Sequence, residues 1–130
     1  MSWIMRLRAG GSVTIISAVS ARAAYPGAVG LAAVNGALEA VVPTLAVELA
    51  PVRVNAVSPG IIDTQWWDAL PADQRAAFFQ AAGAASPAGR VGTPDDVAAA
   101  VTYLAGASFV TGTVLECTGG ANLTVGAIGG

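Results

Sequence analysis

The amino-acid sequence predicts an α/β fold, namely part of a doubly wound (Rossmann-like) parallel sheet with three strands and the helices that flank them. Two observations predict it: three short apolar, β-branched runs have the composition of buried strands, and helical segments separate these runs. Buried strands joined by helices pair in parallel, with right-handed crossovers. A length of 130 residues fits one domain or part of one.

The first half of the chain contains the first strand and a long helix. Residues 11–17 form the strand after a Gly–Gly break, and residues 22–30 form a loop. In residues 28–49 apolar side chains recur at steps of three and four, which indicates a helix. Pro43 should kink this helix, because it removes the amide that would bond to the Glu39 carbonyl. The small number of charges predicts that helix 28–49 is covered on more than one side.

The second strand and a mixed segment follow. Residues 52–57 form the strand, and Ser58–Pro59–Gly60 then turns the chain. Residues 64–85 are expected to be helical but irregular.

A helix and the third strand complete the chain. Thr93, Pro94 and two acids directly after them are typical of a helix start, and Gly106 should stop this helix. Residues 113–117 form the third strand, which a Gly–Gly pair closes. The small residues of 124–130 predict a flexible tail.

The composition excludes several kinds of site. The chain has no His, and its six basic residues are all Arg, so catalysis by His, a Schiff-base Lys and a P-loop Lys are excluded. A net charge of -2 without a basic patch argues against nucleic acid as a partner. The single cysteine, Cys117, can form neither an internal disulfide nor a thiolate zinc site, and it is expected to be a small buried hydrophobe. No metal site is predicted.

One uncharged stretch raises the question of a membrane. Residues 97–115 are long enough to span a bilayer. Polar and small residues in their middle and second half favour a buried helix, a turn and a buried strand instead. We therefore expect a cytoplasmic protein without a membrane segment, with a spanning helix as the alternative.

Several motifs resemble the short-chain dehydrogenase/reductase family. Residues 52–64 are similar to its sixth strand and the following turn, and residues 89–97 and 110–115 to its last helix and last strand. Residues 37–51 resemble its long dimer-forming helix. The resemblance covers about residues 10–123 and implies a doubly wound fold, hydride transfer between NAD or NADP and a carbonyl or alcohol, and a homo-oligomer formed through helix 28–49.

The chain resembles only the C-terminal half of that family, so residues 1–123 are expected to be the C-terminal half of an NAD(P)-binding domain. The glycine-rich motifs that hold the pyrophosphate, G-x-x-x-G-x-G and G-x-G-x-x-G, are absent. Without the central strands, residues 11–17 would be an apolar edge that invites association.

The catalytic residues of the family are replaced. Ungapped alignment places Ala18 at the serine position, Leu31 at the tyrosine position and Asn35 at the lysine position. No catalytic residue is therefore assigned, and little or no activity is expected of this chain.

Two loop residues are weak stand-ins for the lost groups. Ser20 can reach the pocket, and Tyr25, with a pKa near 10 in the absence of a neighbouring cation, would donate a proton but be a poor base. Asn35 can still hydrogen-bond a ribose hydroxyl. The alternative is that Ser20 and Tyr25 are ordinary loop residues and Asn35 a satisfied helix amide.

The resemblance also implies a cofactor-binding segment. Pro59, Gly60, Ile62 and Thr64 match the turn that lies along the nicotinamide in the family, whereas the alternative is a strand-ending turn. Aromatic residues in the following segment indicate either a lid over a small apolar carbonyl or alcohol substrate or a local core; they are Trp66, Trp67, Phe78 and Phe79.

Nearby acids are assigned no ligand role. Asp63 and Asp68 are expected to be solvated. Asp95 and Asp96 belong to a helix start.

Three functional hypotheses remain. The chain is an oxidoreductase-like protein that is truncated and nearly inactive, a non-catalytic interaction module that pairs through helix 28–49, or a fragment of a longer divergent reductase.

Overall fold

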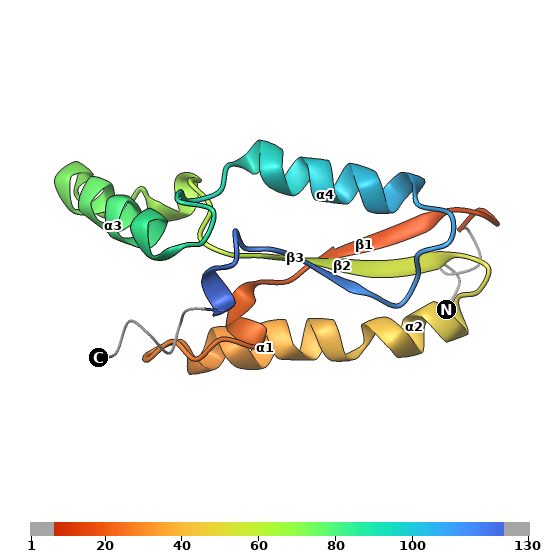
Figure 1. The fold of residues 1–130 in the computed structure, drawn as a ribbon. Helices are drawn as coiled ribbons and strands as arrows, with labels where there is room; N and C mark the ends of the chain where they lie inside the picture. The colour runs from red at the N-terminus through yellow and green to blue at the C-terminus, as the bar shows by residue number, and fades with distance from the viewer. Residues whose placement is uncertain (1–6, 124–130) are drawn as a thin grey trace.

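The fold has three layers, with one parallel sheet between two sets of helices (Figure 1). It is seen in a computed structural model that describes residues 7–123. Helix α4 (Pro94–Gly106) covers one face of the sheet, and helices α1 (Val29–Ala40) and α2 (Val42–Glu48) lie on the other. Helix α3 (Ala72–Ala85) lies beyond the carboxyl ends of the strands.

The sheet contains three parallel strands in the order β1-β2-β3, which confirms the predicted α/β class. Strand β1 spans Ser12–Ile16, β2 spans Arg53–Pro59 and β3 spans Val114–Cys117. In the register, Ala56 of the central strand pairs with Ile15 on one side and Val114 on the other. Within the described residues β1 is an edge strand, as predicted.

The central strand is longer than predicted, because Ser58 and Pro59 continue it instead of turning the chain. Ser58 pairs with Glu116, and Pro59 pairs with Cys117. The neighbouring Gly60 N–H donates to the Cys117 carbonyl at 3.0 Å, so amides of even-numbered β2 residues face β3. The nitrogen of Pro59 therefore points toward β1, which has already ended, and its missing N–H costs the ladder no bond.

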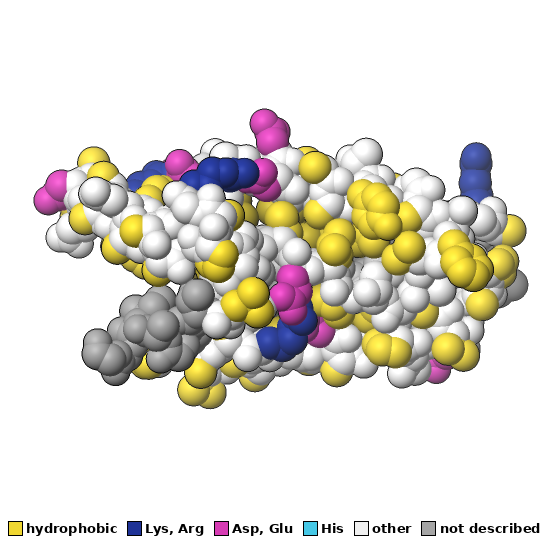
Figure 2. Space-filling model, viewed as in Figure 1, with side chains coloured by type: hydrophobic (Ala, Val, Ile, Leu, Met, Phe, Trp, Pro, Cys, Tyr) yellow, Lys and Arg dark blue, Asp and Glu magenta, His cyan; other side chains and the backbone are white. Residues whose placement is uncertain are grey.

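The core lies between the sheet and its covering helices. Its fully buried side chains come from α2, β2 and α4, and include Val42, Val54, Val57 and Leu104. Side chains on the surface are largely uncharged: in Figure 2, hydrophobic groups are spread over the visible face and charged groups are few.

The prediction of one continuous helix over 28–49 is wrong in detail. The segment is divided into α1 and α2, with Val41 in a turn between them. Pro43 lies in the first turn of α2, a position that needs no amide donor, so the chain restarts the helix there. The expected cover is also missing from the described residues, because α1 has no buried residue and Val34 is 61% exposed.

The segment 64–85 is irregular for an identifiable reason. It begins as a short 3-10 turn over Gln65–Trp67, and α3 starts only after Pro71. Pro71 has an extended backbone (φ -54°, ψ 145°), because its ring fixes φ. It is the residue directly before the first turn of α3.

Helix α4 begins as predicted but ends one residue later. Thr93 Oγ1 accepts the Asp96 N–H at 3.3 Å, and the Asp96 carboxylate accepts the Thr93 N–H at 2.8 Å, which forms a capping box. Gly106 is itself the last residue of the helix, so it does not end the helix before residue 106 as predicted. The guanidinium of Arg53 instead donates to three carbonyls at this end, those of Leu104, Ala105 and Ala107, at 2.7–2.8 Å.

The uncharged stretch 97–115 forms a helix, a loop and a strand, as expected in preference to a spanning helix. By length and composition alone, the helical stretch Val29–Glu48 among the described residues is long and apolar enough to cross a membrane. Core helices of soluble proteins meet the same criterion. The predicted tail 124–130 lies outside the described residues.

Candidate functional site

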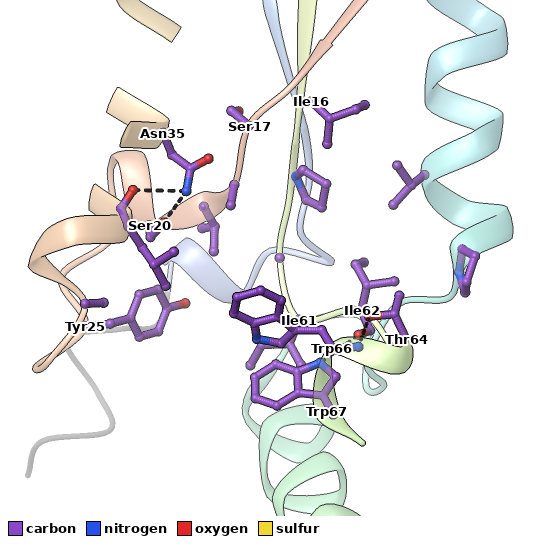
Figure 3. A pocket seen from close by; sticks show the side chains of 18 of the residues that line it. Ile16, Ser17, Ser20, Tyr25, Asn35, Ile61, Ile62, Thr64, Trp66 and Trp67 are labelled. Atoms are coloured by element: carbon purple, nitrogen blue, oxygen red, sulfur yellow. Dashed lines mark hydrogen bonds between the residues drawn. The ribbon is translucent and has the colours of Figure 1, made fainter. Parts of the chain in front are cut away.

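A largely apolar cavity of about 890 Å³ opens at the carboxyl ends of the strands (Figure 3). This is the end at which parallel α/β sheets bind ligands. All nine residues singled out from the sequence line the cavity: Ala18, Ser20, Tyr25, Leu31, Asn35, Pro59, Gly60, Ile62 and Thr64. The tertiary structure thus brings together residues from the loop after β1, the start of α1 and the segment after β2.

The three residues predicted to stand at the family's catalytic positions, Ala18, Leu31 and Asn35, meet at this cavity, where they present a methyl, an isobutyl and an amide group. The Asn35 Nδ2 donates to the Leu31 carbonyl at 3.0 Å and to Ser20 Oγ at 3.1 Å. Both hydrogens of the amide are therefore engaged within the chain. Ser20 is buried and reaches the cavity.

Tyr25 lies on the same side, with its hydroxyl pointing into the space that Trp66 and Trp67 close from the other side (Figure 3). Partial burial raises the pKa of its phenol above the ordinary value of 10.0, whereas an unshifted pKa was expected. No described residue hydrogen-bonds this hydroxyl. Tyr25 therefore stays protonated at neutral pH, and even less of it is present as phenolate, the form that could accept a proton.

Ser17 is held away from this chemistry. Its hydroxyl donates to Glu39 Oε1 at 2.7 Å, on the α1 side of the sheet. The same carboxylate pairs with Arg22 at 3.1 Å, and Arg22 also pairs with Glu116 of β3. This network, which the sequence analysis missed, fixes the loop that carries Ala18 and Ser20.

The segment after β2 forms a second wall of the cavity. A Cβ on Gly60 would lie 3.0 Å from Thr118 Cα, so the close approach of the two strand ends requires glycine there. Ile62 forms an isolated parallel bridge with Gly92, and the Asp63 N–H donates to the Gly92 carbonyl at 2.9 Å. Thr64 Oγ1 accepts the Trp66 N–H at 3.3 Å, which leaves its hydroxyl hydrogen free to donate.

The aromatic residues serve as both a wall and a local core. Trp66, Trp67 and Phe78 line the cavity, whereas Phe79 packs behind them. Trp67 contacts the Phe78 ring with centroids 4.8 Å apart, and its Nε1 donates to the Ile62 carbonyl at 2.9 Å. Trp66 is 71% exposed at the mouth. The local-core interpretation therefore applies to Trp67, Phe78 and Phe79, whereas the lid over a substrate stays a prediction.

Arg75 makes structural contacts beside the cavity that the sequence did not predict. It pairs with Asp68 at 2.6 Å and with Asp63, and it donates to the Thr64 carbonyl at 3.2 Å. Its guanidinium carbon lies 5.3 Å from the centre of the Phe79 ring. The two acids are exposed to solvent as expected, with side chains 50% and 62% exposed, and they also pair with this arginine, which α3 brings across from a different element.

The remaining candidate groups have structural surroundings. Arg90 pairs with Asp96 at 2.7 Å. This ion pair, together with the hydrogen bond from the Thr93 N–H, holds the pKa of the Asp96 carboxyl well below its ordinary range. Cys117 is half-buried and not fully buried as predicted, and burial raises the pKa of its thiol. Within the described residues no group of three His, Cys, Asp or Glu side chains is placed to hold a metal ion.

Comparison with known proteins identifies relatives across nearly the whole chain. The family profile described as enoyl-(acyl carrier protein) reductase matches residues 2–122. The short-chain dehydrogenase/reductase ATR9 of Stachybotrys chlorohalonatus is 40% identical over 86% of this chain and 44% of its own length. The L-fucose dehydrogenase of Oryctolagus cuniculus is 42% identical over 92% of this chain and 44% of its own.

Solved structures agree with these relatives. A small-chain dehydrogenase in complex with NADPH superposes with a TM-score of 0.89 at 40% identity, over 93% of this chain and 55% of that protein. The angucycline C-6 ketoreductase LanV, solved with bound NADP, superposes with a TM-score of 0.74 at 28% identity, over 88% of this chain and 44% of its own. The chain spans about half the length of the curated relatives it matches. It belongs to the short-chain dehydrogenase/reductase family.

Proposed function

We propose that this chain carries the substrate-side half of an NAD(P)-linked oxidoreductase site that interconverts a small apolar alcohol and its carbonyl compound. The observation that carries the proposal is the convergence of two family-matched segments on one cavity: the loop and helix around Tyr25 and Asn35, and the segment from Pro59 to Thr64. Relatives named as dehydrogenases and ketoreductases support the reaction class.

The cofactor would contact this chain through few groups. NAD or NADP supplies the hydride in this family. Thr64 has a hydroxyl hydrogen free to donate, and Pro59, Gly60 and Ile62 provide an apolar surface beside it. The sequence contains no glycine-rich pyrophosphate turn, and the cavity lining carries no charged side chain that would hold a phosphate. The described residues therefore fit the nicotinamide end only.

Little or no turnover is expected of the chain by itself. Ala18 and Leu31 have no group that transfers a proton, and Asn35 has no charge to lower the pKa of a phenol. Calorimetry with NADPH and a panel of ketones tests this expectation. Micromolar NADPH binding would contradict the lack of a pyrophosphate site, and turnover of any ketone above buffer would contradict the lack of a proton donor.

A non-catalytic oligomerisation module is the second candidate. Helices α1 and α2 expose apolar side chains that include Val29 at 81%, Val34 at 61% and Val47 at 80%. A second copy docked on residues 28–49 would bury them, and the dimer should be lost when Val34 and Val47 are both replaced by Lys. Mass measurement in solution decides the question, because a monomeric parent chain would contradict pairing.

A fragment of a longer divergent reductase is the third candidate. The 44% share of its relatives that the chain covers favours it. An in-frame G-x-x-x-G-x-G upstream of the Met1 codon would support it, and its absence would contradict it. A cytoplasmic location without nucleic-acid or membrane partners is part of all three proposals; binding to neutral or anionic vesicles would contradict it.

A further inference from the structure

We propose that the cavity selects a neutral apolar alcohol over the matching ketone, and that Asn35 makes the selection. The inference rests on the proposed function in one respect, namely that this cavity is the substrate site. It adds which of the two compounds, the alcohol or the ketone, the cavity binds more tightly, and which atom causes the difference in affinity.

The orientation of the Asn35 amide follows from its partners. The Leu31 carbonyl oxygen can only accept a hydrogen bond, so the atom 3.0 Å from it must be the amide nitrogen. The second hydrogen of this nitrogen is directed to Ser20 Oγ at 3.1 Å. The amide has no further hydrogen to offer a ligand.

The Asn35 Oδ1 remains as an acceptor. No described residue donates a hydrogen bond to this oxygen. The oxygen is also not one of the fully buried side-chain atoms that lack a partner. It therefore remains open to solvent at the cavity wall. Figure 3 shows this oxygen on the side of the amide that faces away from the Leu31 bond. A ligand group that excludes solvent from this oxygen must donate a hydrogen bond to it, or the oxygen is left unpaired.

The neighbouring hydroxyls supply the complementary contact. Ser20 Oγ already accepts from Asn35, so its own hydrogen is free to donate. The Tyr25 hydroxyl has no described partner and stays protonated, because burial raises its pKa. An alcohol can donate its hydroxyl hydrogen to Asn35 Oδ1, and Ser20 and Tyr25 are hydroxyl donors in the same cavity. A ketone accepts only and leaves Oδ1 unpaired.

The rest of the cavity requires a neutral, apolar body. Among the described residues, no side chain that lines the cavity is charged. Ile16, Ile61 and Phe78 contribute aliphatic and aromatic surface, and Trp66 stands exposed at the mouth. An ionised ligand would lose hydration there without gaining a counter-charge.

The test compares cyclooctanol with cyclooctanone, which differ only at one carbon and its oxygen (CH–OH against C=O). Binding is followed without cofactor by the fluorescence of the pocket tryptophans and by ligand-detected NMR. We expect the alcohol to bind about tenfold more tightly, the ratio for one unpaired buried acceptor. In Asn35→Leu the preference should fall to about one.

Two further variants make the result specific. Gln80→Leu makes a similar polar-to-apolar change on the exposed side of α3, outside the cavity, and should keep the parent preference. Tyr25→Phe removes one hydroxyl with little change of shape, and it should weaken the binding of the alcohol and of the ketone alike. This variant is the substitute if Asn35→Leu does not fold.

Each outcome decides the proposal. Equal affinities in the parent chain would overturn it, as would a preference that survives Asn35→Leu. If NADPH binds and the alcohol does not, the Asn35 acceptor serves a ribose hydroxyl, and the proposal also fails. Turnover of a ketone with NADPH would contradict the low activity proposed above but leaves this measurement untouched, because the binding is measured without cofactor.

Discussion

Placing tyrosine at position 31 and lysine at position 35 should create a phenol with a depressed pKa. These positions are one turn apart on α1, and the Asn35 side chain already bonds to the Leu31 carbonyl at 3.0 Å. Side chains at this spacing have Cβ atoms about 6 Å apart and face the same side of the helix. In Leu31→Tyr/Asn35→Lys the ammonium will therefore lie beside the phenol oxygen and stabilise the phenolate.

The expected shift follows from Coulomb's law. Two unit charges about 5 Å apart attract each other by roughly 3 kcal/mol at an effective dielectric constant of about 20, and by roughly 0.8 kcal/mol in bulk water. These energies correspond to a pKa lowered by about 2.4 and about 0.6 units. Leu31 is 48% exposed, so solvent screens the pair, and we expect a shift of about one unit.

The assay is a pH titration of tyrosinate absorbance in the near ultraviolet. The parent spectrum is subtracted because the parent chain also contains two tyrosines, Tyr25 and Tyr103. Leu31→Tyr alone gives the reference pKa, and Leu31→Tyr/Gln80→Lys adds the same charge on α3, away from the cavity lining. Equal pKa values in all three variants would refute the placement of residues 31 and 35 as neighbours at the cavity.

Three further predictions concern stability. Leu104 is 1% exposed between α4 and the sheet, so Leu104→Ala should lower the free energy of unfolding in urea by roughly 3 kcal/mol; a change below about 1 kcal/mol would contradict its core position. Arg90 depresses the pKa of Asp96 in the folded chain. The ion pair therefore stabilises the fold at pH values above about 3.8, the pKa of Asp96 in the unfolded chain, and this stabilisation is lost as the pH falls below that value. Asp96→Asn should therefore reduce the acid dependence of the melting temperature, and an unchanged dependence argues against the ion pair. Ser58 Oγ is buried without a partner among the described residues, so Ser58→Ala should leave stability unchanged or raise it by up to about 1 kcal/mol, as urea midpoints will show; a clear loss would mean that an ordered water satisfies it.

The outline of the fold was predictable because its signals are local. The three strands are short apolar runs, and the α4 start depends on residues within one turn, Thr93 to Asp96. The order of strands and helices, together with the rule on crossovers, was enough to predict a parallel sheet. The errors lay at boundaries, where Pro43 restarted a helix and Arg53, a residue of the second strand, capped α4 in place of Gly106.

The candidate site was predictable as a set of residues but not as a geometry. Ungapped alignment placed Ala18, Leu31 and Asn35 at the family positions, and all three line the cavity. The alignment could not show that both hydrogens of the Asn35 amide are engaged, nor that the hydroxyl of Tyr25 has no described partner. Those properties depend on where the loop after β1 meets α1.

The sequence by itself determined the fold class and the family, because each depends on residue type and on spacing within one segment. Only the tertiary structure decided which groups meet across segments. Arg75 reaches Asp63 and Asp68 from α3, and Ser17 reaches Glu39 across 22 positions. The physical reason is that periodicity and capping act over a few residues, whereas hydrogen bonds and ion pairs between elements form only after the sheet and its covering helices have packed.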